Sequence, residues 1–202
     1  MPPIVSDSYK EKRKKEILES AMACFAKKGF QPSTIDDIVE HSGISKGAIY
    51  NYFKSKDEIY LELMKTSTEE SYEELKERLA TYPNAVDKMN FMFDLYLNNE
   101  VNQESTGRLV VHDEFKLHAF RNQELIEKLN VRRHEYFIKM FCSIIEEGQK
   151  AGEFKTELNP EIFADMFWSM IDGIMLQTIY PGFPYKQVLN EFKQMFLERI
   201  IL

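Results

Sequence analysis

Apolar residues recur at intervals of three and four along nearly the whole chain, and the strict alternation typical of half-buried strands is scarce. Intervals of three and four place side chains on one face of an α-helix. Glycines, prolines and paired asparagines separate the periodic stretches, as expected for turns between helices. The pattern predicts an all-α protein of about nine helices.

Three helices are expected at the N-terminus. They run from about Tyr9 to Lys28, from Ser33 or Thr34 to about Gly43, and from Ser45 to about Tyr52. Ser8 and Glu11 have the spacing of a capping box at the start of the first helix. The second and third are about two turns long, too short to be stable alone, so they must pack on the first. This arrangement predicts a three-helix unit that contains a helix-turn-helix.

A second capping box, Ser55 with Glu58, starts a long helix over residues 56–79, and Pro83 lies just beyond its end. Five further helices are expected over residues 85–98, 105–119, 122–149, 160–179 and 185–201. We therefore predict two domains, 1–55 and 56–202, with residues 56–80 as the linking helix.

The charge of the chain is unevenly distributed. Residues 1–56 hold 10 Lys and Arg against 7 Asp and Glu, whereas residues 57–202 hold 16 against 26. A local positive face can therefore attract a polyanion although the net charge is -7. The N-terminus has no apolar stretch behind its charges, and no later run approaches the ~20 apolar residues of a membrane span. We expect a cytoplasmic protein with no membrane partner.

The segment of residues 45–52 has small residues on the outer side of its predicted helix. Ile44, Ile49 and Phe53 can turn inward, which leaves Lys46, Gly47, Ala48, Tyr50, Asn51 and Tyr52 on the outer faces and flanks. A helix with so little bulk in its first turn can approach base edges in the major groove. The two tyrosines, Thr34 and Lys56 then suit phosphates. For any single one of these residues, the alternative interpretation stays open that it forms part of a polar rim over the core and does not contact DNA.

The segment TIDDIVEHSGISKGAIYNYFKSKDEIYLELM resembles the DNA-binding signature of the TetR family of bacterial transcriptional regulators. The matching residues are Gly43, Ser45, Gly47, Tyr50, Tyr52, Phe53, Ser55, Lys56 and Ile59. Ile59 stands in place of the usual leucine and Val39 in place of a common alanine, and both are apolar exchanges. The resemblance covers about residues 10–60.

The resemblance implies an N-terminal DNA-binding domain and a C-terminal helical domain that binds a small effector and dimerises. Repression is the commoner mode in the family. The DNA-facing positions that it implies are Thr34, Ser45, Lys46, Gly47, Ala48, Tyr50, Asn51, Tyr52 and Lys56. Double-stranded DNA is accordingly the expected partner, and no cofactor is expected.

Aromatic, thioether and imidazole side chains from several of the later helices form a candidate effector pocket. Its members are Phe91, Tyr96, His112, Phe115, His118, Met140, Phe141, Trp168 and Met175. Such a set is typical of a largely apolar small-molecule site with a few polar groups. Aromatic and Met residues at helical spacing are also typical of a plain core, so this alternative stays open.

The last two predicted helices are apolar around much of their circumference, which calls for a second partner. By the resemblance, they form a four-helix interface in a homodimer. Candidate interface residues are Phe163, Phe167, Met170, Ile174, Phe192 and Phe196, unless they face only the intramolecular core. A two-fold dimer predicts a palindromic operator. An effector would act by preferring a conformer with wrongly spaced recognition helices, with helix 56–79 as the lever.

Two functions of other classes remain to be weighed. His112, Glu114 and His118 do not build an enzyme or metal site, because only Glu114 and His118 share a helix face and two ligands are too few. No phosphate-binding glycine loop or nucleophile elbow occurs. We therefore predict that the protein is not an enzyme and holds no metal. The alternative function is a helical small-ligand carrier that does not bind DNA.

Overall fold

The protein is built from helices, and the computed structural model describes residues 7–202. The elements are α1 Asp7–Lys28, α2 Ile35–Ser42, α3 Lys46–Tyr50, α4 Lys56–Leu79, α5 Ala85–Leu97, α6 Gln103–Ala119, α7 Gln123–Arg132, the π-helical turn η1 Arg133–Ile138, α8 Lys139–Ala151, α9 Pro160–Leu176, the 3-10 turn η2 Gln177–Ile179 and α10 Tyr185–Ile200. Since α7, η1 and α8 run on without a break, the described residues form nine principal helices. The predicted fold class is confirmed.

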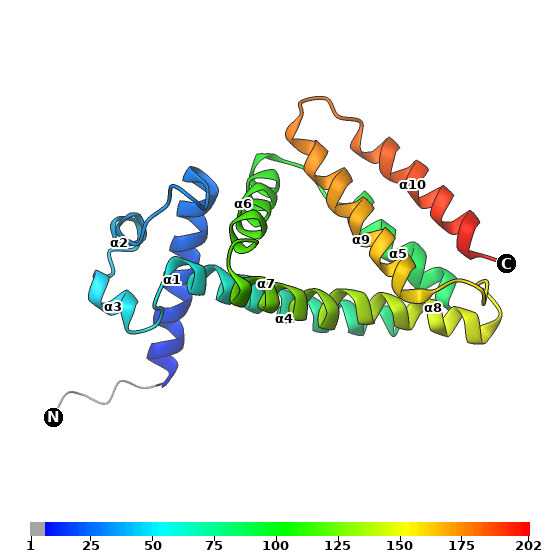
Figure 1. Cartoon of the computed structure of the whole chain (residues 1–202), viewed down its shortest axis with the longest axis horizontal. Coiled ribbons are helices and arrows are strands. Elements are labelled where there is room, and N and C mark those ends of the chain that lie inside the picture. Colours follow the sequence, from blue (N-terminus) through cyan, green and yellow to red (C-terminus); the bar gives the residue numbers. More distant parts are fainter. Residues whose placement is uncertain (1–6) are drawn as a thin grey trace.

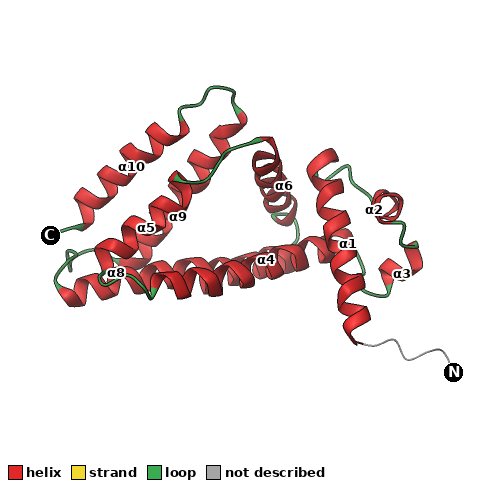
Figure 2. Cartoon of the chain, turned by 180° about the vertical axis from the view of Figure 1, so that it is seen from behind, coloured by secondary structure: helices red, strands yellow, loops and turns green. Residues whose placement is uncertain are grey.

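The helices are arranged from one end of the molecule to the other (Figure 1). Helices α1, α2 and α3 lie at one end, and α5, α9 and α10 lie at the opposite end. Helix α4 extends between the two groups, and α6 stands between them. The reverse view shows the same order (Figure 2). The helix-turn-helix is therefore presented at an end of the molecule, away from α9 and α10.

The start of α2 is set by a capping box. The hydroxyl of Thr34 accepts the N–H of Asp37 at 3.2 Å, and the carboxylate of Asp37 accepts the N–H of Thr34 at 2.8 Å. This identifies Thr34, and not Ser33, as the cap of α2. The box predicted at Ser8 is wrong, because α1 is already helical at Asp7.

The cap of α4 departs from the predicted box in one contact. The hydroxyl of Ser55 accepts the N–H of Glu58 at 3.2 Å, as expected. The carboxylate of Glu58 accepts the N–H of Lys54 at 2.6 Å instead of that of Ser55. The carboxylate thus binds one residue earlier in the chain, and α4 still begins at the predicted position.

Two clusters of buried apolar residues stabilise the molecule. The first joins α1–α3 and the start of α4 to α6 and α7, with Phe25, Phe30 and Phe115 fully buried in it. The second joins α5, α8, α9 and α10. Because α6 contributes to the first cluster, the helix-turn-helix unit packs against residues far beyond position 55. The predicted domain boundary between residues 55 and 56 therefore stays a prediction. Residues 1–6 of the predicted N-terminal domain lie outside the described part of the chain.

Candidate nucleic-acid interface and ligand cavities

The turn between α2 and α3 depends on a glycine in the left-handed region. Gly43 has φ 67°, a value at which a side chain is strained, and its N–H donates to the carbonyl of Val39 at 2.9 Å. The hydroxyl of Ser45 then accepts the N–H of Ala48 at 3.3 Å and caps α3. These contacts fix the direction of α3 relative to α2.

The structure exposes most of the predicted DNA-facing positions. Thr34, Ser45, Lys46, Gly47, Tyr50 and Asn51 are exposed, whereas Ala48, Tyr52 and Lys56 are partly buried. Tyr52 packs against the first core cluster. Apart from Thr34, which caps α2, the exposed positions belong to α3 and its two ends, and they offer a hydroxyl, an ammonium, a phenol and an amide on one short segment.

Lys46 lies at the first turn of α3 and forms an ion pair with Asp36 of α2 at 2.8 Å. The hydrogen bond that Lys46 donates to the carboxylate of Asp36 raises the pKa of Lys46. Both side chains are exposed, so solvent weakens their attraction. Lys46 can therefore exchange Asp36 for a stronger anion without losing a buried partner.

Lys56 has a different environment from the one predicted. Its ammonium donates to the carbonyls of Phe30 at 2.8 Å, Gln31 at 2.7 Å and Ser33 at 3.1 Å. It also lies 4.6 Å from the centre of the Phe30 ring. An ammonium has three N–H donors, so none remains for a phosphate in this arrangement. Lys56 ties the start of α4 to the loop between α1 and α2.

A groove of about 470 Å³ lies between the start of α1 and α3. It is lined by Tyr9, Lys10, Arg13, Gly43, Ile44, Ser45, Ala48, Asn51 and Tyr52. Lys10 and Arg13 were not among the predicted site residues. The signal for them is the run of basic residues at positions 10–15, but its position beside α3 depends on the packing of α1.

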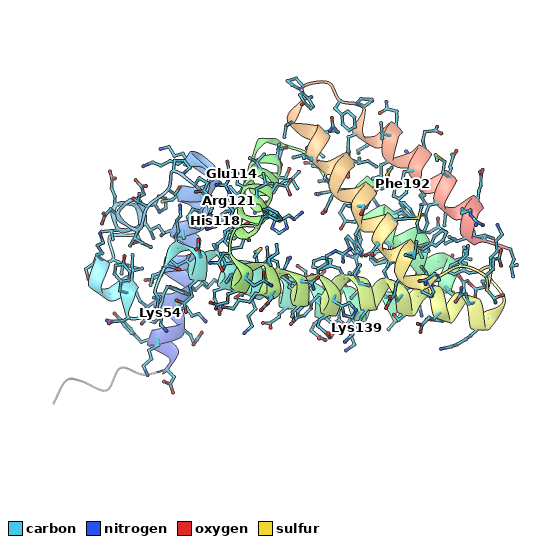
Figure 3. All side chains as sticks on the ribbon, in the orientation of Figure 1. Lys54, Glu114, His118, Arg121, Lys139 and Phe192 are labelled. Atoms are coloured by element: carbon cyan, nitrogen blue, oxygen red, sulfur yellow. The ribbon has the colours of Figure 1, made fainter. Side chains whose placement is uncertain are left out.

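Helix α6 connects the C-terminal helices to the helix-turn-helix unit. The carboxylate of Glu114 accepts the N–H of Phe30 at 2.5 Å, and the imidazole of His118 lies 3.1 Å from the carboxylate of Asp57. The ring of Phe115 is 5.0 Å from that of Phe30. Glu114 and His118 are labelled on α6 in Figure 3. These contacts join α6 to the loop between α1 and α2 and to the start of α4.

Two cavities lie between the helices beyond α4. The larger, about 650 Å³, is bordered by α6, α7, η1 and α9, and the smaller, about 340 Å³, by α4, α5, η1 and α8. Of the predicted pocket residues, His112 and Met175 line the larger cavity, Met140 lines the smaller, and Tyr96 and Trp168 line both. These volumes are in the range of small-molecule sites.

Four predicted pocket residues lie elsewhere. Phe91 stacks on Tyr82 at 4.9 Å, and Phe141 stacks on Phe167 at 4.3 Å inside the second core cluster. Phe115 and His118 face the helix-turn-helix unit as described above. None of the four lines either of these cavities, because aromatic residues at helical spacing fill the two cores as well as the cavities.

The imidazole of His112, which lines the larger cavity, is held neutral. Burial, together with the nearby cations Lys116 and Arg132, lowers the pKa of His112 to about 4. A neutral imidazole can donate one hydrogen bond and accept another. His112 therefore offers a ligand a polar contact without a charge at neutral pH.

Most of the predicted dimer residues are in the intramolecular core. Phe163, Phe167, Ile174, Phe192 and Phe196 are at most 8% exposed, and only Met170 is open to solvent. Figure 3 labels Phe192 on α10. The predictions are wrong for these five residues because α9 and α10 bury them against each other and against α5 and α8.

Helix α9 carries a second apolar side that no described residue covers. Ile162, Met166 and Met170 are spaced by four residues and are 45–55% exposed, and Met195 of α10 is 67% exposed. We call the first three the α9 stripe. By length and composition alone, residues Pro160–Ile179 could cross a membrane, contrary to the expectation that no run approaches such a length. Helices α6, α8 and α10 nonetheless pack against α9.

Within residues 7–202, no group of three or more His, Cys, Asp or Glu side chains is placed to hold a metal ion. An exposed helix-turn-helix with a basic groove, joined through α6 to a cavity-bearing helical domain, is the architecture of a ligand-responsive DNA-binding regulator.

Comparison with known protein families agrees with this class. Residues 17–63 match the family of bacterial regulatory proteins called the tetR family, and residues 93–189 match a tetracyclin repressor-like C-terminal domain. The chain is 31% identical over 180 residues to the HTH-type transcriptional regulator YfiR of Bacillus subtilis, covering 89% of this chain and 86% of that protein. The chain belongs to the TetR family. It is a DNA-binding transcriptional regulator and not an enzyme.

Solved structures share the fold. A transcriptional regulator from Saccharomonospora viridis in complex with choline has a TM-score of 0.81 at 21% identity and covers 95% of this chain and 99% of its own. The regulator FadR from Bacillus subtilis in complex with stearoyl-CoA has a TM-score of 0.74 at 23% identity, with 91% and 95% covered. The two ligands differ in size and charge, so the fold alone does not indicate the effector of this chain.

Proposed function

We propose that this protein is a repressor that binds a palindromic operator as a homodimer and is released by a small, largely apolar effector. The observation that carries the proposal is α6, which lines the larger cavity on one side and holds the helix-turn-helix unit on the other. The match to a repressor-like C-terminal domain supports the mode of action. Such a protein works in the cytoplasm, where the DNA is.

The proposed DNA contacts are Thr34 at the start of α2 and the predicted positions of α3 and its two ends. Lys46, Gly47 and Ala48 approach the bases, and Thr34, Ser45, Tyr50, Asn51 and Tyr52 contact the backbone or flank the groove. Lys10 and Arg13 of the basic groove add phosphate contacts. Lys56 is assigned to the support of α4 because its donors are occupied. We also propose the domain division of 1–55 and 56–202, with 56–80 as the link.

The proposed dimer uses the α9 stripe and Met195 in place of the buried phenylalanines. Exposed methionines at a spacing of four residues on a helix are suited to packing against a second copy. A two-fold axis at this end places two α3 helices on successive turns of a duplex, ~34–36 Å apart or a multiple of that.

We expect the effector to control DNA binding through α6 more than through α4. His112 and Lys116 of α6 face the larger cavity, whereas Glu114, Phe115 and His118 contact the helix-turn-helix unit. A ligand that binds better to a shifted position of α6 changes the separation of the α3 helices. The ligand can shift the equilibrium between the two positions of α6 by as much as its binding free energy differs between them.

The test is selection of duplexes from a random pool by the purified protein, followed by binding measurements over a range of salt. The proposal expects a palindrome and an affinity that falls steeply with salt. Lys46→Ala should relax the choice of base, and Tyr50→Phe should weaken all duplexes alike. A protein that enriches no duplex even at low salt would be a ligand carrier, and the proposal would be abandoned.

A further inference from the structure

Four side chains form the wall between the two cavities: Tyr96, Arg132, Phe137 and Trp168 border both. The Nε of Arg132 donates to the hydroxyl of Thr68 at 2.8 Å, and its guanidinium lies 5.0 Å from the centre of the Phe137 ring. These two contacts hold the guanidinium in place. Its Nη groups donate to no side chain or carbonyl in residues 7–202.

The Nη groups are not fully buried. No side-chain nitrogen or oxygen in the described residues is fully buried without a hydrogen-bond partner, and the Nη atoms have no such partner. The cavities on the two sides of the wall are open space that Arg132 borders. A partly buried guanidinium whose fork of donors points into a cavity is a receptor for a planar or tetrahedral anion.

Arg132 is also distinct from every other charged side chain that lines either cavity. Lys116 pairs with Asp172 at 3.0 Å, Arg133 pairs with Asp165, Arg78 lies 4.0 Å from Glu74, and Glu127 accepts a hydrogen bond from Gln123. Within residues 7–202, no carboxylate lies within 4.0 Å of Arg132. Burial lowers the pKa of Arg132, as expected for a partly buried cation with no paired carboxylate.

We propose that the effector is an amphipathic anion, whose carboxylate or phosphate binds the Nη groups of Arg132 and whose apolar body occupies the larger cavity. The inference rests on the proposed effector-controlled function and adds the chemical class of the ligand. Leu109, Ile126, Leu129, Ile171 and Met175 supply the apolar surface of that cavity. A cationic ligand is disfavoured although aromatic rings are present, because the guanidinium already covers the face of Phe137.

The decisive experiment compares head groups on one ten-carbon chain. Decanoate, decyl phosphate, decanol and decyltrimethylammonium are titrated into the full-length protein below their micelle concentrations. Trp168 is the single tryptophan of the chain and borders both cavities, so its fluorescence reports binding at the proposed site. We expect one or both anions to bind about ten- to a hundredfold more tightly than decanol, the range of a charge-assisted hydrogen bond. Comparison of the two anions distinguishes carboxylate from phosphate.

Two variants at neighbouring positions test whether Arg132 causes the preference for an anionic head group. Arg132→Gln should remove the preference for the anion and leave the affinity for decanol unchanged. Arg133→Gln is the matched control, since Arg133 lines the same cavity but is paired with Asp165, and it should keep the preference. Circular dichroism and thermal unfolding verify that both variants are folded. The head-group series on the unaltered protein decides the question even if Arg132→Gln does not fold.

The inference would be overturned if decanol or the ammonium compound bound as tightly as the anions, or if no member of the series changed the Trp168 signal. Neither result would affect the operator selection described above, which tests DNA binding without an effector. If the protein bound no operator but still preferred anions, the proposed repressor function would be overturned. The protein would then be an anion-binding carrier. The two failures are therefore distinguishable.

Discussion

Gly148 of α8 lies against the ring of Phe154. A Cβ at this position would be 2.2 Å from Cδ2 of that ring, which is fully buried. We expect Gly148→Ala to lower the free energy of unfolding by about 1–3 kcal/mol, the usual cost of overpacking, despite the better helix propensity of alanine. Urea unfolding at neutral pH measures this.

Gly107 of α6 serves as the control for this substitution. It is also inside a helix, and the nearest contact of an added Cβ is 3.9 Å, from the carbonyl oxygen of Ala26. Gly107→Ala should therefore leave stability unchanged or raise it by up to about 1 kcal/mol. Equal destabilisation by both substitutions would show that the contact with Phe154 is not the cause.

His112 makes folding sensitive to acid. Its pKa is lowered from 6.5 to about 4 in the folded protein, so the unfolded chain takes up this proton first as the pH falls. The neutral His112 contributes at most about 3 kcal/mol to the free energy of unfolding. This contribution is fully present above pH ~6.5 and is lost as the pH falls from ~6.5 to ~4. His112→Gln should be less sensitive than wild type over this window in urea unfolding at several pH values. His41→Gln, on the exposed side of α2, should follow wild type.

At the scale of elements, the start of α4 is held by one ammonium. Lys56→Met removes the three contacts to the loop of residues 30–33, so we expect a loss of about 1–3 kcal/mol in the free energy of unfolding. The dependence of DNA binding on salt should keep its slope, because no phosphate contact is lost. Lys10→Met, at a proposed phosphate contact on the exposed side of α1, should do the reverse, with stability kept and the slope reduced by about 1. A lower slope for Lys56→Met at unchanged stability would restore it as a phosphate contact.

Helix boundaries and the helix-turn-helix were accessible from the sequence because their signals are local. Thr34 and Ser55 cap helices by bonding to backbone three residues on, and Gly43 reverses the chain by its own conformation. By contrast, the residues that surround an apolar side chain come from distant parts of the sequence. Phe167 and Met166 are adjacent on a helix that is apolar on two sides, and only packing shows that the phenylalanine faces the core and the methionine faces out. The buried dimer candidates and four of the pocket candidates failed for this reason.

At the scale of the whole molecule, the α9 stripe should decide the oligomeric state. Met166→Glu places a charge in the middle of the stripe, and the cost of burying it should shift the dimer to monomer. Operator affinity should fall with it, because each half-site would bind alone. Leu117→Glu is the control, since Leu117 is 76% exposed on α6 and lies outside the stripe. Sedimentation velocity should then show monomer for the first variant and dimer for the second, and the reverse result would place the interface elsewhere.

The π-helical turn Arg133–Ile138 lies inside the continuous helix that borders both cavities. Such a turn holds one more residue per hydrogen-bonded loop than an α-helix does. Loss of a single residue there would let the helix become regular, and the preceding residues would rotate by about 100° relative to α8. Arg132 would leave the wall between the cavities while α8 kept its packing. A one-residue deletion in a relative would therefore be enough to change which ligand the regulator binds.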